Sequence, residues 1–395
     1  MKHEQIAAIM NYGAQFHSVM SIGLVTKTIF MAVKKLNIAF VYNVRHKKPS
    51  LIDAEAMAQA EFDEPSTING IAQGLRKLGH NIFRIEANED VYAKLKCLKS
   101  KIDLVFNIAE GIKNADREAQ IPAMLENLDL PYVGSKPITH ALCLNKAYTK
   151  KVLSYHQIPT PKFQIFYEPN ERLSRRLHFP LIVKPNAEGS SKGIFNDSVV
   201  ENEVQLYKKI GDILDDYKQP ALVEEFLNGR EFTVAIIGNR PAEVLPPVEI
   251  KFDNLPKNLR PIDSYEVKWI LDNPESNIQT VQCPAEMDFK LFTQIKKICL
   301  KTKQALDILD WCRIDLRLDV KGRPHILEIN QLPGIIPDPK ENSRLPLAAR
   351  SAGYTYEEML HKIIKAACDR YDIKLSPALE PAPEKATNWL VTAFS

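Results

Sequence analysis

The sequence lacks the features that mark several protein classes. Its 395 residues carry 52 basic and 49 acidic side chains, so the charge excess that nucleic-acid-binding domains use is missing. Its six cysteines are scattered, with no C-x-x-C pair and no clustered histidine. This spacing argues against a zinc site and against a disulfide framework, and it favours a reducing compartment. We therefore expect a cytoplasmic protein that binds no nucleic acid.

Long apolar runs are missing as well. Residues 1–33 are moderately apolar, but polar residues such as Asn11, Gln15 and Ser18 interrupt each run before it reaches the roughly 20 residues that a membrane helix needs. The stretch also has no convincing signal-peptide cleavage site. Because AVKKLNIAFVYN, which follows Met31, is a natural beginning for a first strand, we interpret residues 1–33 as an N-terminal extension that need not belong to the fold. We expect no membrane association.

The clearest pattern in the chain is alternation of polar and apolar residues in two short segments, 313–319 and 326–330. A period of two predicts half-buried strands. The expected polar faces consist of Arg313, Asp315, Arg317 and Asp319 in the first strand and Ile326, Glu328 and Asn330 in the second. Between the strands, Lys321-Gly322 fits a two-residue turn, in which glycine supplies a positive φ.

The register of this hairpin brings two carboxylates together. A two-residue turn sets position 320 opposite 323, Asp315 opposite Glu328 and Arg313 opposite Asn330. Facing carboxylates repel each other, and a cation between them removes the repulsion. Because Asp, Glu and Asn supply the hard oxygen ligands that Mg²⁺ prefers, we predict a magnesium site here. The alternative interpretation is a solvated hairpin face without a function.

Strands and helices alternate between residues 34 and 142. Short apolar runs predict strands at 36–43, 81–85 and 102–107, and amphipathic segments predict helices at 67–78 and 118–128. This alternation is typical of a small parallel α/β domain, which we place at residues 34–142.

Residues 143–235 are interpreted as a second, central domain. Strands predicted at 179–184 and 221–226 end in Lys184 and in Glu224-Glu225-Phe226, and the segment EGSSKG (188–193) lies between them. The main-chain N–H groups, hydroxyls and lysine of such a loop can hold anionic oxygens. It is not a Walker A loop, because the required spacing is missing, and a Gly-Ser-rich surface turn is the alternative interpretation.

Residues 236–372 are interpreted as a third domain, followed by a flexible, proline-containing tail at 373–395. We expect two strands around a Gly-Asn turn within 231–251, a helix at 288–307 that leads into the hairpin, and a final amphipathic helix at 354–371. The segment 263–273 has no clean period and is predicted to be a loop.

Taken in order, these motifs resemble those of the D-alanine:D-alanine ligase family, within the ATP-grasp superfamily. CRIDLRLD (312–319) and LEINQLPG (327–334) resemble the metal-binding end of such a ligase, and the resemblance extends over about residues 35–372. It implies an ATP-grasp fold of the α/β (α+β) class, with an N-terminal parallel α/β domain, a central lid domain and a C-terminal mixed-sheet domain. It also implies an ATP-dependent ligase that joins small amino acids through an acylphosphate, as in dipeptide formation for peptidoglycan precursors. A homodimer would be usual for such ligases.

The resemblance also implies roles for single residues. The residues that match the ATP-binding positions of the family are Lys146, Lys184, Ser190, Ser191, Glu224, Glu225, Leu227, Glu231 and Lys268. Asp315, Glu328 and Asn330 match the ligands of Mg²⁺, or of Mn²⁺ in its place. Arg313, Lys268, Ser190 and Gly334 match catalytic positions, and Ser343, Gly334 and Trp269 lie where the substrates are expected.

Three departures from the family pattern lie around the first amino acid. The glycine-rich N-terminal segment with its substrate-binding glutamate is absent, and NIAEG (107–111) stands where a His-Gly segment is expected. Trp269 replaces a tyrosine that would hydrogen-bond Ser190, and an indole N–H can only donate.

These departures leave two alternatives open. One is a ligase that joins other amino acids or small carboxylates to amines. The other, from a different class, is a non-catalytic ATP-binding regulatory protein. The chain argues against it, because such a protein would not need the complete set of Lys268, Arg313, Asp315, Glu328 and Asn330.

Overall fold

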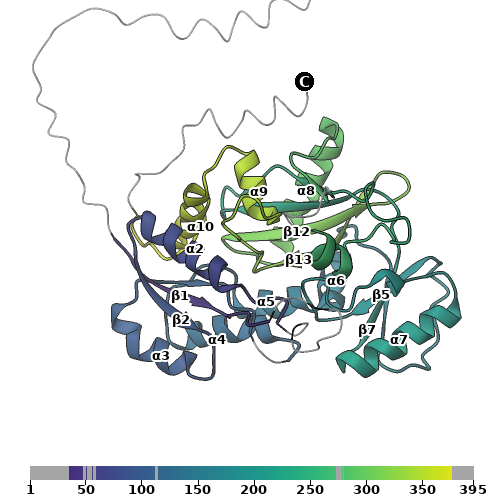
Figure 1. Cartoon of the computed structure of the whole chain (residues 1–395), viewed down its shortest axis with the longest axis horizontal. Coiled ribbons are helices and arrows are strands. Elements are labelled where there is room, and N and C mark those ends of the chain that lie inside the picture. Colours follow the sequence, from purple (N-terminus) through teal and green to yellow (C-terminus); the bar gives the residue numbers. More distant parts are fainter. Residues whose placement is uncertain are drawn as a thin grey trace, which may run out of the picture. The chain divides into compact units, whose positions relative to one another are not determined.

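The computed structural model describes residues 35–47, 50, 56, 59–111, 114–272, 278 and 280–375 (Figure 1). The predicted N-terminal extension, and the tail 373–395 beyond its first three residues, lie outside the described residues. Three separate sheets organise the described part of the chain. None of the helices in these ranges is long and apolar enough to span a membrane.

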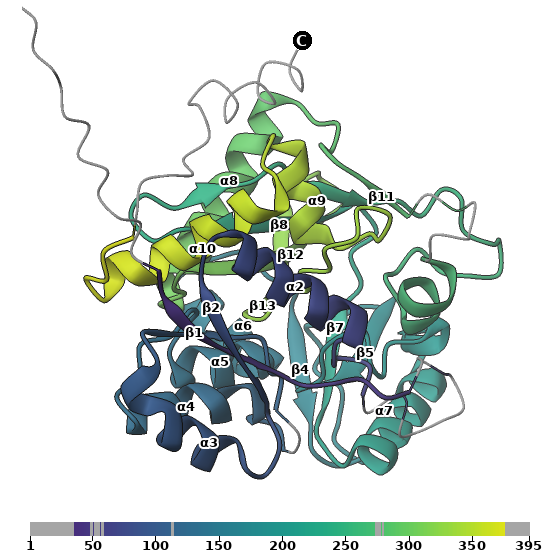
Figure 2. The same ribbon diagram turned by 60° about the vertical axis from the view of Figure 1, so that its left-hand side comes forward.

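The first sheet is parallel, as the alternation of elements predicts. Its strands β1 (Asn37–Tyr42), β2 (Asn81–Glu86) and β3 (Leu104–Asn107) are arranged in the order β2-β1-β3. The accompanying helices are α2 (Pro65–Lys77), α3 (Val91–Leu98), η1 (Lys99–Lys101), η2 (Arg117–Ala119) and α4 (Gln120–Asn127). Phe40 and Phe106 pack with α2 on one face, whereas Val41 and Val105 pack with α3 and α4 on the other (Figure 2). This alternation is the period-two pattern of a sheet buried on both faces.

The second sheet is antiparallel. Its strands β4 (Phe163–Phe166), β5 (Leu181–Pro185), β6 (Val199–Val200) and β7 (Ala221–Glu225) are arranged in the order β4-β7-β5-β6. Two helices precede it, α5 (Pro137–Leu144) and α6 (Lys146–Tyr155), and the turn η3 (Asn196–Ser198) and the helix α7 (Glu203–Tyr217) lie within the same stretch. The apolar stripe of α7 packs against Val183 and Val223. Because side chains alternate along a strand, Lys184 and Glu224 project from the opposite face.

The third sheet has the order β11-β10-β8-β12-β13, with β9 paired to β8. Its strands are β8 (Glu231–Ile237), β9 (Glu243–Val244), β10 (Val248–Ile250), β11 (Val281–Gln282), β12 (Trp311–Leu318) and β13 (Pro324–Asn330). Helix α8 (Phe289–Ala305) packs against Ile314 and Leu316 on one face. Helices α9 (Arg344–Ser351) and α10 (Tyr356–Arg370) pack against apolar residues of β8 and β10, and α10 also packs against α2 (Figure 2).

One proposed domain boundary needs adjustment. The boundary at residue 235 falls inside β8, and β8 pairs with β12 from Glu231 to Ile237. We therefore propose that the C-terminal domain begins before Glu231.

The hairpin register is confirmed at the site residues but wrong near the turn. Asp315 pairs with Glu328 and Arg313 with Asn330, as predicted. Beyond them the ladder shifts by one residue, so that Leu327 is an extra residue on β13 and Ile326 lies on the core face with Ile314. The turn is correspondingly longer than predicted. The hydrogen bond that closes it joins Asp319 N to Arg323 O, whereas the predicted turn paired position 320 with 323. The extra residue in the turn offsets the extra residue in the bulge, so the pairing of Asp315 and Arg313 is the predicted one.

The loop predicted at 263–273 contains regular structure. Residues Val267–Leu271 form a π-helical turn, η4, in which Asp272 N bonds to Val267 O. Such turns are typical of functional sites, and this one presents Lys268 and Trp269 from consecutive positions.

Candidate active site

A cleft lies between the central sheet and the C-terminal sheet. Apolar side chains such as Ile182, Ile262 and Leu327 form part of its lining. Eight of the residues predicted to bind nucleotide or metal also line it, namely Lys184, Ser191, Glu224, Glu225, Leu227, Glu231, Asp315 and Glu328. A cleft with apolar walls and a few convergent charges is suited to a ligand that has an aromatic ring and anionic groups.

Lys184 belongs to a buried charge cluster with Glu224 and Lys150. The Nζ atoms of Lys184 and Lys150 lie 2.9 Å and 2.8 Å from the Glu224 carboxylate oxygens. Although burial opposes it, the two lysines hold the pKa of Glu224 below its ordinary value, and burial lowers the pKa of Lys150 to about 8. Lys150 also donates to Thr160 Oγ1 at 2.8 Å. The cluster therefore fixes Lys184 in the lining of the cleft.

Lys146 connects the hairpin with the Gly-Ser loop, by which we mean residues 188–193. Its Nζ lies 3.3 Å from Glu328 Oε2 and donates to the main-chain carbonyl of Glu188. The helix that carries it begins here because Asn145 accepts a capping hydrogen bond from Tyr148 N. Lys146 thus lies beside the cleft, next to a predicted metal ligand.

Three neighbouring side chains bind Asp315, one of the predicted metal ligands. Arg313 donates Nε to Asp315 Oδ1 at 3.0 Å and Nη2 to Oδ2 at 2.9 Å, and Asn330 Nδ2 donates to Oδ2 at 2.9 Å. Despite burial, Arg313 holds the pKa of Asp315 well below its usual range. The side chain of Thr233 donates to the same carboxylate.

This donor set fits a hard divalent cation. Asp315 is ionised, and Glu328 lies opposite it on the neighbouring strand. The hydrogen bond from the Asn330 amide nitrogen to Asp315 fixes the orientation of the amide group and so of its oxygen. Within the residues that the structure describes, no group of three His, Cys, Asp or Glu side chains could hold a metal unaided. Asp315, Glu328 and Asn330 would therefore hold a Mg²⁺ ion only together with ligands from outside the protein.

The Gly-Ser loop has an unusual main chain. Ser190 and Ser191 are both left-handed, with φ of 51° and 59°. Their main-chain N–H groups donate to no acceptor in the described part of the chain. Consecutive N–H groups of this kind form a concave site for anionic oxygens.

The segment 263–272 lies over this loop. Trp269 Nε1 donates to the carbonyl oxygen of Ser190 at 3.0 Å, and Ser191 Oγ donates to Asp263 O at 2.8 Å. The Arg45 guanidinium lies 5.3 Å from the centre of the Trp269 ring. The indole therefore links the segment to Ser190 through the main chain, where a tyrosine could use the serine hydroxyl.

The residues predicted at the second-substrate position also lie together. Ser343 Oγ donates to Gly334 O at 2.9 Å and accepts from Ile336 N at 3.1 Å. The neighbouring Arg344 makes a 2.8 Å ion pair with Asp263. This contact joins the start of α9 to the segment that covers the Gly-Ser loop.

Comparison with known proteins identifies the family. Residues 152–365 match the model described as D-ala D-ala ligase C-terminus. The chain is 34% identical to the uncharacterized protein y4sG of Sinorhizobium fredii over 311 residues, which cover 77% of this chain and 88% of that protein. It is 33% identical to D-alanine--D-alanine ligase of Aquifex aeolicus, over 75% of this chain and 93% of that enzyme.

The chain belongs to the D-alanine–D-alanine ligase family. It is an ATP-dependent ligase. Two solved structures share its ATP-grasp fold. One is the ATP complex of D-alanine--D-alanine ligase from Bacillus anthracis, with a TM-score of 0.61, 22% identity, and coverage of 85% of this chain and 99% of that one. The other is the VanG D-Ala:D-Ser ligase from Enterococcus faecalis, with a TM-score of 0.64, 20% identity, and coverage of 85% and 100%.

The ligase brings together residues that the sequence analysis did not single out. Lys150 and Thr233 contact Glu224 and Asp315, and Glu61 and Arg117 contact the Gly-Ser loop. Lys150 could have been found, because it lies four residues after Lys146 on the same helical face. Glu61 could not, because its contacts depend on residues more than 50 positions away.

The charge of Lys268 is expected to limit the ligase at alkaline pH. Desolvation, together with the charges of Arg344 and Arg313, lowers the pKa of Lys268 to about 8. If the ammonium binds the transferred phosphoryl group, then kcat/KM for ATP falls as the pH rises through about 8, because the free enzyme loses that charge. Lys268→Arg should move this decline to higher pH, since arginine stays protonated. Rates between roughly pH 6.5 and 9.5 test this; an unchanged decline in Lys268→Arg would assign it to another group.

Proposed function

We propose that this ligase joins two small amino acids in an ATP-dependent reaction, with D-alanine at both positions, to supply a dipeptide for peptidoglycan precursors. The observation that supports this proposal most strongly is the arrangement around one cleft of Lys184, Arg313, Asp315, Glu328 and Asn330. Relatives named D-alanine--D-alanine ligase cover most of the chain. The proposal includes a cytoplasmic location and a homodimer, the latter measurable by sedimentation.

In the proposed first step, the carboxylate of the donor amino acid attacks the γ-phosphorus of ATP. An acylphosphate forms and ADP leaves. Lys184 and Lys268 would stabilise the negative charge on the transferred phosphoryl oxygens, and the N–H groups of Ser190 and Ser191 would bind other phosphate oxygens of ATP. Lys146, Glu224, Glu225, Leu227 and Glu231 would hold the rest of the nucleotide. When bound by Asp315, Glu328 and Asn330, Mg²⁺ would neutralise phosphate charge.

In the second step, the deprotonated amine of the acceptor attacks the acyl carbon. A tetrahedral intermediate forms and collapses with loss of inorganic phosphate, which leaves a peptide bond. We assign the stabilisation of its oxyanion to Arg313 and the Gly334 N–H, and a donor of this kind contributes roughly 3 kcal/mol in comparable sites. Ser343, with Gly334, would receive the carboxylate of the acceptor.

A second candidate is a ligase of the same kind with another donor. It is favoured by Trp269, which binds the Ser190 carbonyl, and by Glu61, whose carboxylate is fully engaged by protein groups. Both residues lie beside the loop where the first amino acid is expected.

A phosphate-release screen tests the function. Purified ligase with ATP and Mg²⁺ would be assayed against D- and L-amino acids, with D-alanine alone as the first condition. Turnover with D-alanine alone is the expected result. Turnover only with other pairs would favour the second candidate, and ATP binding without turnover on any pair would contradict the proposed function.

A further inference from the structure

Glu61 and Arg117 form a buried ion pair beside the Gly-Ser loop. Glu61 precedes α2, and Arg117 begins η2. Arg117 Nη2 lies 2.7 Å from both Glu61 oxygens, and its Nε lies 3.1 Å from Oε2. Only 7% of the Arg117 side chain and 4% of the Glu61 side chain are exposed. A pair this buried is held in one geometry by its bonds and its packing.

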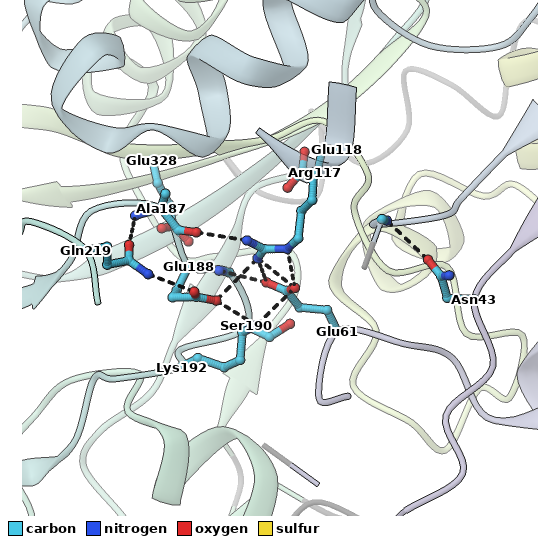
Figure 3. Close-up of polar contacts among 12 residues, drawn as sticks. Asn43, Glu61, Arg117, Glu118, Ala187, Glu188, Ser190, Lys192, Gln219 and Glu328 are labelled. Atoms are coloured by element: carbon cyan, nitrogen blue, oxygen red, sulfur yellow. Dashed lines mark hydrogen bonds and ion pairs between the residues drawn. The ribbon is translucent and has the colours of Figure 1, made fainter. Parts of the chain in front are cut away.

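Both residues bind the main chain at the beginning of the loop. Gly189 N donates to Glu61 Oε1 at 2.8 Å, and Arg117 Nη1 donates to Ala187 O at 3.0 Å. Lys192 Nζ lies 3.1 Å from Glu61 Oε2 and 2.6 Å from Glu188 Oε2. Figure 3 shows these side chains converging on the loop. Residues far earlier in the sequence therefore fix the loop on both sides of Glu188.

The loop conformation needs such a restraint. Ser190 and Ser191 carry Cβ atoms, so their left-handed φ values are unfavourable for an isolated loop. Their N–H groups point to no acceptor in the described residues, which is the arrangement that a phosphate would require. A Cβ at position 189 would lie 2.5 Å from Glu61 Oε1, so a larger residue there would displace the Glu61 carboxylate from this contact.

Protein groups bind both oxygens of the Glu61 carboxylate. It accepts from Arg117 and from Gly189 N, it pairs with Lys192, and a carboxylate has about four acceptor positions in all. Although burial opposes it, Lys192 and Arg117 lower the pKa of Glu61 to about 2. A substrate ammonium that approached this carboxylate would meet two cations already bound to it.

We propose that Glu61 and Arg117 are positioning residues that set the Gly-Ser loop for the phosphates of ATP, and that Glu61 does not bind the donor amino acid. The proposal rests on the proposed ATP site. It assigns to an ion pair in the N-terminal part of the chain a role in nucleotide binding by the central part.

Four variants test the proposal. Glu61→Gln keeps the shape but removes the charge, Arg117→Lys keeps the charge but removes the two-pronged contact, and Gly189→Ala disturbs the loop contact with both partners intact. Glu357→Gln is the control, because it removes an exposed ion pair with Lys77, which lies at the other end of α2 from Glu61. Each variant would be studied as the full-length ligase by steady-state kinetics and by hydrogen exchange.

Glu61→Gln and Gly189→Ala should raise the KM for ATP by about ten-fold or more, while kcat at saturating ATP and the donor KM change by less than about three-fold. Amide exchange should rise in the peptide that contains residues 187–193, stay unchanged in β1 and β3, and fall again when ATP is saturating. For Arg117→Lys, the KM for ATP and the amide exchange of the loop should lie between those of these variants and those of the wild type. For Glu357→Gln, both should match the wild type.

A raised donor KM in Glu61→Gln, with ATP KM and loop exchange unchanged, would overturn the proposal and make Glu61 a donor-binding residue. If Glu61→Gln does not fold, Gly189→Ala decides by the same two readouts. If the wild type turns over no substrate pair, the proposed function fails, but ATP affinity by calorimetry and loop exchange in the variants still decide the role of the pair.

Discussion

Glu328→Gln is expected to remove nearly all turnover while the ligase stays folded. Glu328 faces Asp315 across the hairpin and is one of two carboxylates in the proposed metal set. The amide is isosteric but carries no charge, so the Mg²⁺ that neutralises phosphate charge would be bound poorly. Metal ions of this kind contribute several kcal/mol to transition states, so a loss of about 100-fold or more in kcat is expected.

A Mg²⁺ titration measures the effect of Glu328→Gln. The required concentration should rise in the variant, and circular dichroism should show an intact fold. Glu243→Gln is a suitable control, because Glu243 belongs to the same sheet but pairs with Tyr354 and Lys362. Normal turnover of Glu328→Gln at limiting Mg²⁺ would remove Glu328 from the metal set.

Lys184→Ala is expected to abolish most of the thermal stabilisation that ATP gives. A ligand that binds only the folded state stabilises it by mass action, by about 2.7 kcal/mol at a concentration 100 times its Kd. Lys184 is held at the cleft by Glu224, and its removal leaves Glu224 paired with Lys150. The fold should therefore persist without the nucleotide contact.

Differential scanning fluorimetry with and without ATP measures this change. Lys208→Ala is the control, because Lys208 is an exposed lysine on α7 that pairs only with Asp212 in the described part of the chain. An undiminished melting-temperature shift in Lys184→Ala would mean that the phosphates of ATP lie elsewhere.

The hairpin shows how a local pattern can give the correct site through an incorrect turn. The predicted two-residue turn set Asp315 opposite Glu328, and the two residues do pair although the turn is longer. The bulge at Leu327 was not predictable from the pattern, because Ile326 N bonds to Pro159 O from a distant segment. The Leu327 side chain consequently lines the cleft, whereas alternation alone assigned that face to Ile326.

The parts of the site that the sequence did not reveal depend on contacts between distant segments. The family pattern placed a glutamate near the first amino acid but did not identify it in this chain. Glu61 lies in that region, and its role depends on Arg117 and on Gly189, which are 56 and 128 positions away. No periodicity or spacing rule connects such residues, whereas Asn145 could be recognised as a helix cap from its local sequence.

The central claim is that ATP activates a carboxylate as an acylphosphate in the cleft between the central and C-terminal sheets. The most direct test uses donor amino acid labelled with ¹⁸O in its carboxylate, with mass spectrometry of the released phosphate. Transfer of one ¹⁸O atom into phosphate for each peptide bond formed is the expected result, because the oxygen that attacks phosphorus leaves with it. Phosphate that carries only unlabelled oxygen, formed together with dipeptide, would contradict the claim.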